Sequence, residues 1–131
     1  MNNFPPFPDQ ILNIEKIDIG TFYIYPKFTL GVVNEGVNLT LPQLSVLVAL
    51  CERNYHLKNF VYISMRINSY SIDPTLYSYL LEMKNLKGIA VVTNKKIFRQ
   101  NFQVEQVFYG NNMRIFNTVE EAVSWSNNLI D

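Results

Sequence analysis

Cys51 and His56 are the side chains whose types could support nucleophilic catalysis or metal binding, and each is the single residue of its kind in the chain. A lone histidine cannot supply the two or three ligands of a typical zinc site. No other side chain is placed by sequence to lower the pKa of the thiol, and the thiolate is the reactive form. We therefore expect no catalytic residue, no metal site and no cofactor, and we do not expect an enzyme.

A small basic cluster of Lys95, Lys96 and Arg99 opens a helix that is predicted from about Lys95 to Val107, with Asn94 as its cap. Cations at a helix N-terminus oppose the helix dipole. The cluster therefore has two interpretations, which are an anion-binding site and a solvated surface.

The 131 residues are enough for one compact domain. Lys plus Arg and Asp plus Glu balance at 11 each, so the chain lacks the basic excess of a nucleic-acid binder. A single cysteine excludes an internal disulfide, and no leader pattern precedes the first turn, which favours a cytoplasmic protein. No apolar run approaches the roughly 20 residues that cross a bilayer, so we expect no stable membrane insertion.

Residues 1–13 are predicted to be a Pro-rich N-terminal arm, and residues 14–131 a single domain. Prolines at positions 5, 6 and 8 exclude a helix in the arm. The arm is either disordered or docked on a sheet edge or a second subunit.

Strands are predicted from short runs of β-branched and aromatic residues. Lys16 to Tyr25 alternates, Pro26-Lys27 makes a turn and Phe28 to Val33 returns, which predicts a β-hairpin. Gly88 to Thr93 is continuously apolar and β-branched, as in a strand buried on both faces of a parallel sheet. Two further strands are predicted at Phe60 to Met65 and Met113 to Phe116.

Helices are predicted between these later strands. Thr40 to Gln43 has the form of a capping box, and the helix behind it places Cys51 on its apolar face, in the core. Thr118 to Glu121 is a second capping box, and Trp125 is expected to anchor the last helix to the core.

Another helix begins at Pro74, with Ser71 or Asp73 as its cap, and Gly88 closes it. Its buried stripe is expected to be Leu76, Tyr79, Leu80 and Met83.

Together these elements predict an α/β sandwich, with an N-terminal hairpin followed by three further β-α units. The expected sheet is mostly parallel and five-stranded, and it is covered by four helices. With this order, the chain from about Glu15 to Ile130 resembles the SpoIIAA-like family, the STAS/SEC14-like domains common among uncharacterised bacterial proteins. The resemblance rests on Ile19 to Val33, on Gly88 to Thr93 and above all on Arg114 to Trp125 (RIFNTVEEAVSW).

Relatives with STAS domains include anti-sigma factor antagonists, which bind partner proteins and are switched by phosphorylation of a serine at a helix start. The resemblance therefore implies a non-enzymatic regulatory or protein-interaction module. It places the switch within Arg66 to Asp73, where Ser69 and Ser71 are the positional candidates for phosphorylation. This stretch lacks the glycine of the family's Asp-Ser-x-Gly pattern.

The carboxyl ends of the parallel strands are the expected binding surface, because open parallel sheets bind ligands there. Two helix-start loops supply the candidate ligand- or partner-binding residues, which are Arg66, Asn68, Ser69, Tyr70, Ser71, Asn94, Lys95 and Lys96.

A carrier of a small apolar, lipid-like ligand is the alternative hypothesis. Aromatic residues near the helix faces suggest it, although the same residues can simply fill a core. They are Tyr62, Tyr70, Tyr77, Tyr79, Phe98, Phe102 and Phe108. We also expect a homodimer, because the arm is apolar and the edge strand Lys16 to Tyr25 has an open ladder.

Overall fold

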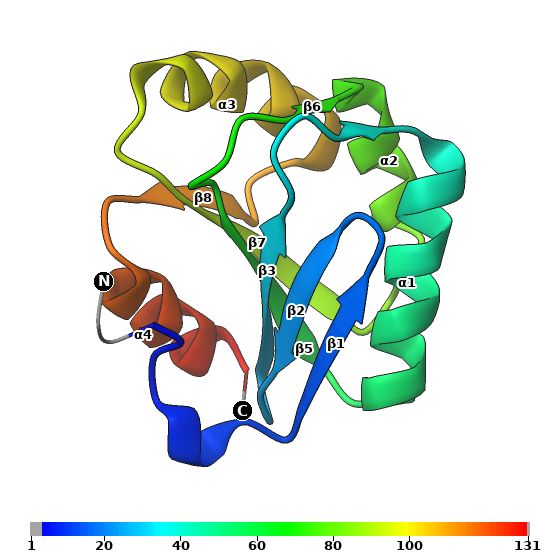
Figure 1. Cartoon of the computed structure of the whole chain (residues 1–131), viewed down its shortest axis with the longest axis vertical. Coiled ribbons are helices and arrows are strands. Elements are labelled where there is room, and N and C mark those ends of the chain that lie inside the picture. Colours follow the sequence, from blue (N-terminus) through cyan, green and yellow to red (C-terminus); the bar gives the residue numbers. More distant parts are fainter. Residues whose placement is uncertain (1–3, 131) are drawn as a thin grey trace.

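A six-stranded sheet organises residues 4–130, the part of the chain that this computed structural model describes (Figure 1). Its strand order is β1-β2-β3-β5-β7-β8. Strands β1 to β3 pair antiparallel, and the remaining pairs are parallel. The strands are β1 (Asn13–Ile17), β2 (Gly20–Ile24), β3 (Phe28–Val33), β5 (Phe60–Met65), β7 (Leu86–Val92) and β8 (Met113–Phe116). Two short strands, β4 (Asn38–Leu39) and β6 (Ser71–Ile72), form a separate parallel pair.

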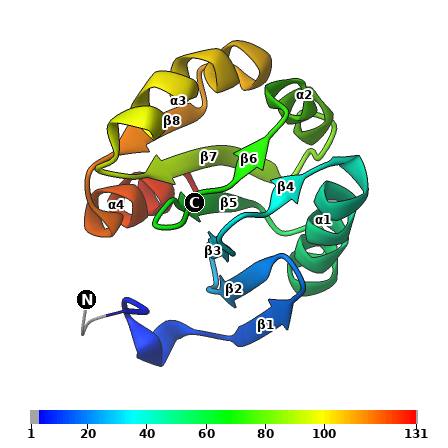
Figure 2. The same ribbon diagram turned by 45° about the horizontal axis from the view of Figure 1, so that its top comes forward.

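Helices cover both faces of the sheet (Figure 2). Residues 4–130 contain four α-helices, which are α1 (Leu41–Tyr55), α2 (Tyr77–Leu80), α3 (Lys96–Tyr109) and α4 (Val119–Leu129). Two 3-10 turns, η1 (Pro8–Gln10) and η2 (Pro74–Leu76), complete the elements. Helices α1, α2 and α3 lie on one face, and α4 lies on the other. No helix within residues 4–130 is both long and apolar enough to span a membrane.

The α/β sandwich with four helices is confirmed, but the five-stranded sheet is wrong because the predicted strand Lys16 to Tyr25 is two strands. The chain turns at Asp18-Ile19 between β1 and β2. Asn34 holds this turn, since its backbone N–H donates to the Ile19 carbonyl at 2.8 Å and its side chain donates to the Asp18 carbonyl at 3.1 Å. The alternation of apolar and polar residues continues through this turn, so the sequence pattern does not show that one strand ends and another begins there.

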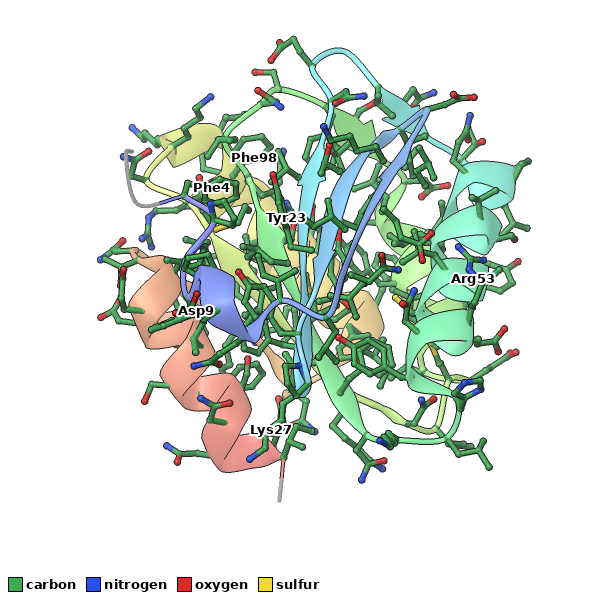
Figure 3. All side chains as sticks on the ribbon, turned by 60° about the horizontal axis from the view of Figure 1, so that its bottom comes forward. Phe4, Asp9, Tyr23, Lys27, Arg53 and Phe98 are labelled. Atoms are coloured by element: carbon green, nitrogen blue, oxygen red, sulfur yellow. The ribbon has the colours of Figure 1, made fainter. Side chains whose placement is uncertain are left out.

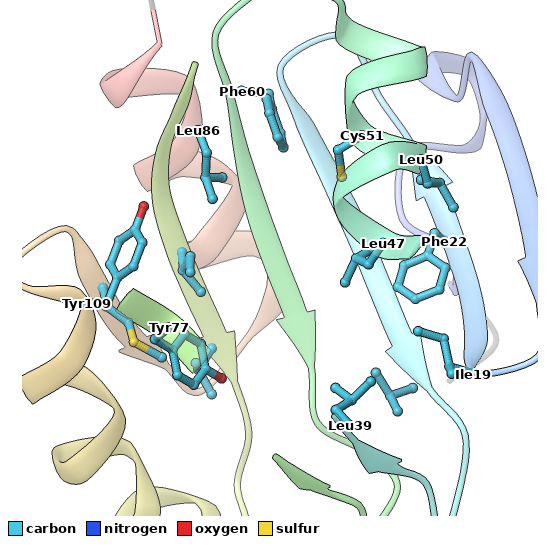
Figure 4. Close-up of a cluster of buried hydrophobic side chains, with 14 of the residues drawn as sticks. Ile19, Phe22, Leu39, Leu47, Leu50, Cys51, Phe60, Tyr77, Leu86 and Tyr109 are labelled. Carbon is cyan, nitrogen blue, oxygen red and sulfur yellow. The ribbon is translucent and has the colours of Figure 1, made fainter. Parts of the chain in front are cut away.

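Strand β7 is buried from Gly88 to Val92, as its apolar sequence predicts. Gly88 lies inside this strand and does not end the preceding helix, which corrects the predicted helix end. A β-carbon at Gly88 would lie 2.7 Å from the Trp125 ring, so the glycine makes room for α4. Figure 4 shows the core on the other face, where Leu47, Leu50 and Cys51 of α1 point toward the sheet.

The helix predicted from Pro74 is shorter than expected, and its predicted buried stripe is wrong at Tyr79. The rest of the stripe faces the core, since Leu76 is buried and Leu80 and Met83 pack against the core cluster. Asp73 is the cap of this helix, because the Asp73 carboxylate accepts from the Thr75 backbone N–H at 3.0 Å. The first turn is a 3-10 turn, which has about three residues per turn where an α-helix has 3.6. The side chains that follow therefore point in other directions than an α-helix beginning at Pro74 would give them. Tyr77 is buried as a result, and Tyr79, predicted to be buried, is 54% exposed.

The helix caps are local features, and the structure confirms the capping box at Thr118. The Glu121 N–H donates to the Thr118 hydroxyl at 3.2 Å, and the Thr118 N–H donates to the Glu121 carboxylate at 3.3 Å. At α1, the Thr40 N–H donates to the Gln43 side-chain oxygen at 3.0 Å. Lys95 occupies the cap position of α3 in place of Asn94 and makes no side-chain cap bond.

Residues 4–12 lie against the same sheet face as α4 (Figure 3). The Phe4 and Tyr23 rings meet edge to face with their centroids 5.4 Å apart. The Tyr25 hydroxyl donates to the Pro6 carbonyl, and the Leu12 N–H donates to the Ile24 carbonyl at 2.7 Å. This segment is therefore docked on its own sheet. The division into an arm and a domain at residue 13 stays a prediction.

Candidate functional site

The two loops predicted to form the site meet at the carboxyl ends of β5 and β7. The Arg66 N–H donates to the Val92 carbonyl at 3.0 Å. The Lys95 ammonium donates to the Ile67 carbonyl at 2.9 Å, which ties the loop after β5 to the start of α3. The structure therefore brings together the two loops that were expected at the carboxyl edge of a parallel sheet.

Arg66 is buried, since only 2% of the residue is exposed. Its Nη1 donates to Glu105 Oε2 at 3.1 Å and its Nη2 donates to Glu105 Oε1 at 2.8 Å, which makes a two-point ion pair. Nη2 also donates to the Tyr77 hydroxyl at 2.8 Å, and Nε donates to the Ser64 hydroxyl at 3.2 Å. Arg66 is thus the centre of a buried polar network.

Sequence reasoning missed Glu105, Tyr77 and Ser64 as members of this network. One signal was available for Glu105, because Phe98, Phe102, Glu105 and Tyr109 are spaced along one face of α3 and all four are buried. A charged residue within an apolar stripe requires a buried partner of opposite charge.

The electrostatics keep Arg66 and Tyr77 of this network each in one protonation state near neutral pH. Burial by itself lowers the pKa of Arg66, but Tyr77, Tyr70 and Glu105 raise it, and the net pKa lies well above its usual value. Burial raises the pKa of Tyr77 far above its ordinary range. The guanidinium stays charged and the phenol stays neutral, so neither group exchanges a proton at neutral pH.

The loop after β5 is joined to β3 and to the segment after it through Asn68, Ser69 and Ser71. The Asn68 side chain donates to the Val33 carbonyl at 2.9 Å. The Ser69 N–H donates to the Glu35 carboxylate at 2.8 Å, and the Ser71 hydroxyl donates to the Asn38 side chain at 2.8 Å. Both serines are exposed.

Tyr70 turns inward from the same loop. Its hydroxyl is 3.1 Å from that of Ser64, and its ring centroid is 5.8 Å from the Arg66 guanidinium carbon. The Phe98 ring lies at a similar distance of 5.6 Å from that carbon.

At the start of α3, only part of the predicted basic cluster lies together. Asn94 and Lys96 are exposed, and Lys95 bridges to Ile67. Arg99 turns away, because its Nη2 donates to the Thr93 carbonyl at 3.4 Å and contacts the Asn117 side-chain oxygen. The three cations therefore do not converge on one anion-binding point.

Two cavities flank Tyr70. An inner apolar cavity of about 50 Å³ lies between the sheet, α1 and α2, and Tyr62, Tyr70 and Ile72 are part of its wall. An outer cleft of about 240 Å³ lies between α3 and the Tyr70 to Pro74 segment, above Arg66 and Glu105. The inner cavity is smaller than the roughly 150 Å³ that holds a benzene molecule. Its size does not support the carrier hypothesis, and Tyr77, Phe98 and Phe102 are buried core residues.

Cys51 and His56 do not form a reactive pair. Cys51 is buried under α1, and burial raises the pKa of its thiol to about 12. His56 follows the end of α1 and is exposed. Within residues 4–130, no three Cys, His, Asp or Glu side chains gather in a way that could hold a metal ion.

Comparison with known proteins bears on the fold. No protein-family model matches the sequence, and no curated protein is significantly similar to it. Among solved structures, the chain is similar to an uncharacterised protein from the DUF3478 family with a SpoIIAA-like fold, from Shewanella loihica PV-4. The two are 15% identical, the match covers 87% of this chain and 90% of that chain, and the TM-score is 0.51. The chain therefore has the SpoIIAA-like fold that its sequence resembles.

Proposed function

We propose that this chain is a non-enzymatic regulatory or protein-interaction module. Its partner would bind the carboxyl-edge surface, which we define as Ile67, Ser69, Lys95, Lys96 and Ile97. One observation carries the proposal: Ile67 and Ile97 are 51% and 56% exposed on two segments that the Lys95–Ile67 hydrogen bond holds together. Large apolar side chains fixed in this way on neighbouring segments favour a protein partner.

The ionisable groups buried in the chain support a role other than catalysis. Arg66 and Tyr77 keep their protons near neutral pH because their pKa values are raised. The raised pKa of Cys51 makes its thiol a poor nucleophile. A general acid or base works best with a pKa near the operating pH, and these groups are far from it.

Affinity capture with three matched baits tests the proposal. The baits are the wild type, the double variant Ile67→Glu/Ile97→Glu, and Val107→Glu as a control. Val107 is 79% exposed on α3 and lies outside the carboxyl-edge surface. We expect a protein captured from the native lysate by the wild type and by Val107→Glu to be lost with the double variant. Equal capture by all three baits, or none by the wild type, would contradict the proposal.

We also propose that the chain forms a homodimer through β1. This strand pairs only with β2 within residues 4–130, so its outer edge can accept a second strand. Leu12 and Ile14 are 67% and 47% exposed beside this edge. Light scattering should give the mass of a dimer for the wild type and that of a monomer for Ile14→Glu. A monomeric wild type at high concentration would refute the dimer.

A further inference from the structure

The outer cleft above Arg66 and Glu105 has features of a binding site that the interaction surface does not use. Aromatic and apolar side chains form much of its wall, including Tyr70, Phe98 and Val104. Its remaining wall is polar, with Arg66 and Glu105 at the buried end and Asn101 on α3. A concave site with apolar walls and a few polar groups is typical of small-molecule binding.

The Arg66–Glu105 pair retains one hydrogen-bond donor and one acceptor. A guanidinium has five N–H groups. Ser64 takes the one on Nε, Tyr77 and Glu105 take the two on Nη2, and Glu105 takes one of the two on Nη1. Within residues 4–130, the second N–H of Nη1 has no protein acceptor. Glu105 Oε2 accepts only from Nη1, so it can accept a further bond.

Charge decides which class of ligand suits this pair. Arg66 and Glu105 neutralise each other at contact distance in a buried place. An anionic ligand would have to compete with Glu105 for Arg66, and a cationic ligand would have to compete with Arg66 for Glu105. Either exchange leaves a buried charge without its partner, which is costly. A neutral ligand avoids this penalty.

We propose that the outer cleft binds a small, uncharged, aromatic amide. The amide carbonyl accepts from the remaining Nη1 N–H of Arg66, and the amide N–H donates to Glu105 Oε2. The aromatic ring lies against the Tyr70 and Phe98 side chains, where flat rings gain contact area.

Benzamide, benzoate and acetophenone are suitable probes because they share a ring and differ only in the polar group. The wild-type protein is titrated with each probe, and the chemical shifts of its backbone amides are followed by NMR. Benzamide should shift the backbone amide signals of residues around Tyr70, Phe98 and Glu105. Acetophenone lacks the donor, so its affinity should be about fivefold lower, the effect of one hydrogen bond of about 1 kcal/mol. Benzoate should also bind more weakly, because it is charged.

Two pairs of variants test the position and the chemistry of the site. Val104→Trp fills the cleft and should abolish benzamide binding, and Val107→Trp, outside the cleft, should leave it unchanged. Glu105→Gln removes the carboxylate and leaves Arg66 charged, so the preference should change from benzamide to benzoate.

The proposal is overturned if benzamide causes no shifts in the cleft, if Val104→Trp binds it as the wild type does, or if folded Glu105→Gln still prefers benzamide. A Glu105→Gln variant that does not fold leaves the Val104→Trp and Val107→Trp comparison as the deciding test.

Discussion

Arg66 and Glu105 form a two-point ion pair inside the protein, with N–O distances of 3.1 and 2.8 Å and both side chains almost fully buried. The pair joins the end of β5 to the middle of α3. Tyr77 adds α2 to the same network, since its hydroxyl accepts from Arg66 and donates to Glu105 at 3.3 Å. One set of polar contacts therefore orients α2 and α3 relative to the end of β5.

Removing either partner of this pair should be strongly destabilising, and removing both should not. Arg66→Met or Glu105→Leu leaves one buried charge unpaired, which costs roughly 3–5 kcal/mol. The double variant buries apolar groups of similar size and should recover most of this loss. Urea unfolding of the four proteins measures the effect. A double variant as unstable as the sum of the two single variants would show that the pair does not act as a unit.

The sequence predicted the local features of the fold well and its long-range polar contacts poorly. Strands β5 and β8 and the Thr118 capping box depend on neighbouring residues, and the structure confirms them. The Arg66–Glu105 contact spans 39 residues, so no local pattern reveals it. For the same reason the sequence does not reveal that Arg66, a predicted ligand- or partner-binding residue, is buried. The loops containing Ser69 and Lys95 could be placed because the loops that follow parallel strands all leave the sheet at its carboxyl edge.

Gly88→Ala should destabilise the protein although alanine is small. The added β-carbon would lie 2.7 Å from the Trp125 ring and 3.0 Å from the Asn112 carbonyl oxygen, so α4 has to shift. Overpacking of this kind costs roughly 1–3 kcal/mol. Tryptophan fluorescence should report both the local change and the lower unfolding midpoint. Gly36→Ala is not a suitable control, because Gly36 has a φ of 80°, which strains alanine in another way. An unchanged midpoint for Gly88→Ala would contradict this packing.

Because of Cys51, the free energy of unfolding should decrease with pH in the alkaline range. Burial raises the pKa of its thiol to about 12 in the folded protein, from an ordinary value of 9.0. A group with a raised folded pKa stabilises the protein fully below its unfolded pKa, and this contribution is lost as the pH rises toward the folded value. The stability advantage of the wild type over Cys51→Ala should therefore shrink above about pH 9, by about 1.4 kcal/mol per pH unit. Urea unfolding of both proteins measures it, and a constant difference would contradict a buried thiol.

Tyr25→Phe should loosen the N-terminal segment with little effect on the sheet. The Tyr25 hydroxyl donates to the Pro6 carbonyl, and the ring itself is buried against Phe28. The substitution keeps the ring and removes only the bond to the segment, at a cost of about 1 kcal/mol. Limited proteolysis should then cleave before residue 13 faster than in the wild type. Phe7→Leu serves as the control because Phe7 is 42% exposed. Equal cleavage rates would show that the hydroxyl does not hold the segment.

Ser69→Asp tests whether charge at this candidate phosphorylation position is transmitted to the segment after β3. The Ser69 N–H donates to the Glu35 carboxylate at 2.8 Å, and the Gly36 N–H donates to the Ser69 carbonyl at 2.7 Å. A second carboxylate at residue 69 repels Glu35, and a surface charge pair of this kind is worth roughly 0.2–1 kcal/mol. Hydrogen exchange of the Gly36 amide should therefore be up to about fivefold faster. Ser69→Asn, which has the same shape without charge, should not change it, and Glu35→Gln should cancel the effect of Ser69→Asp. Faster exchange in Ser69→Asn as well would mean that side-chain size, and not charge, opens this contact.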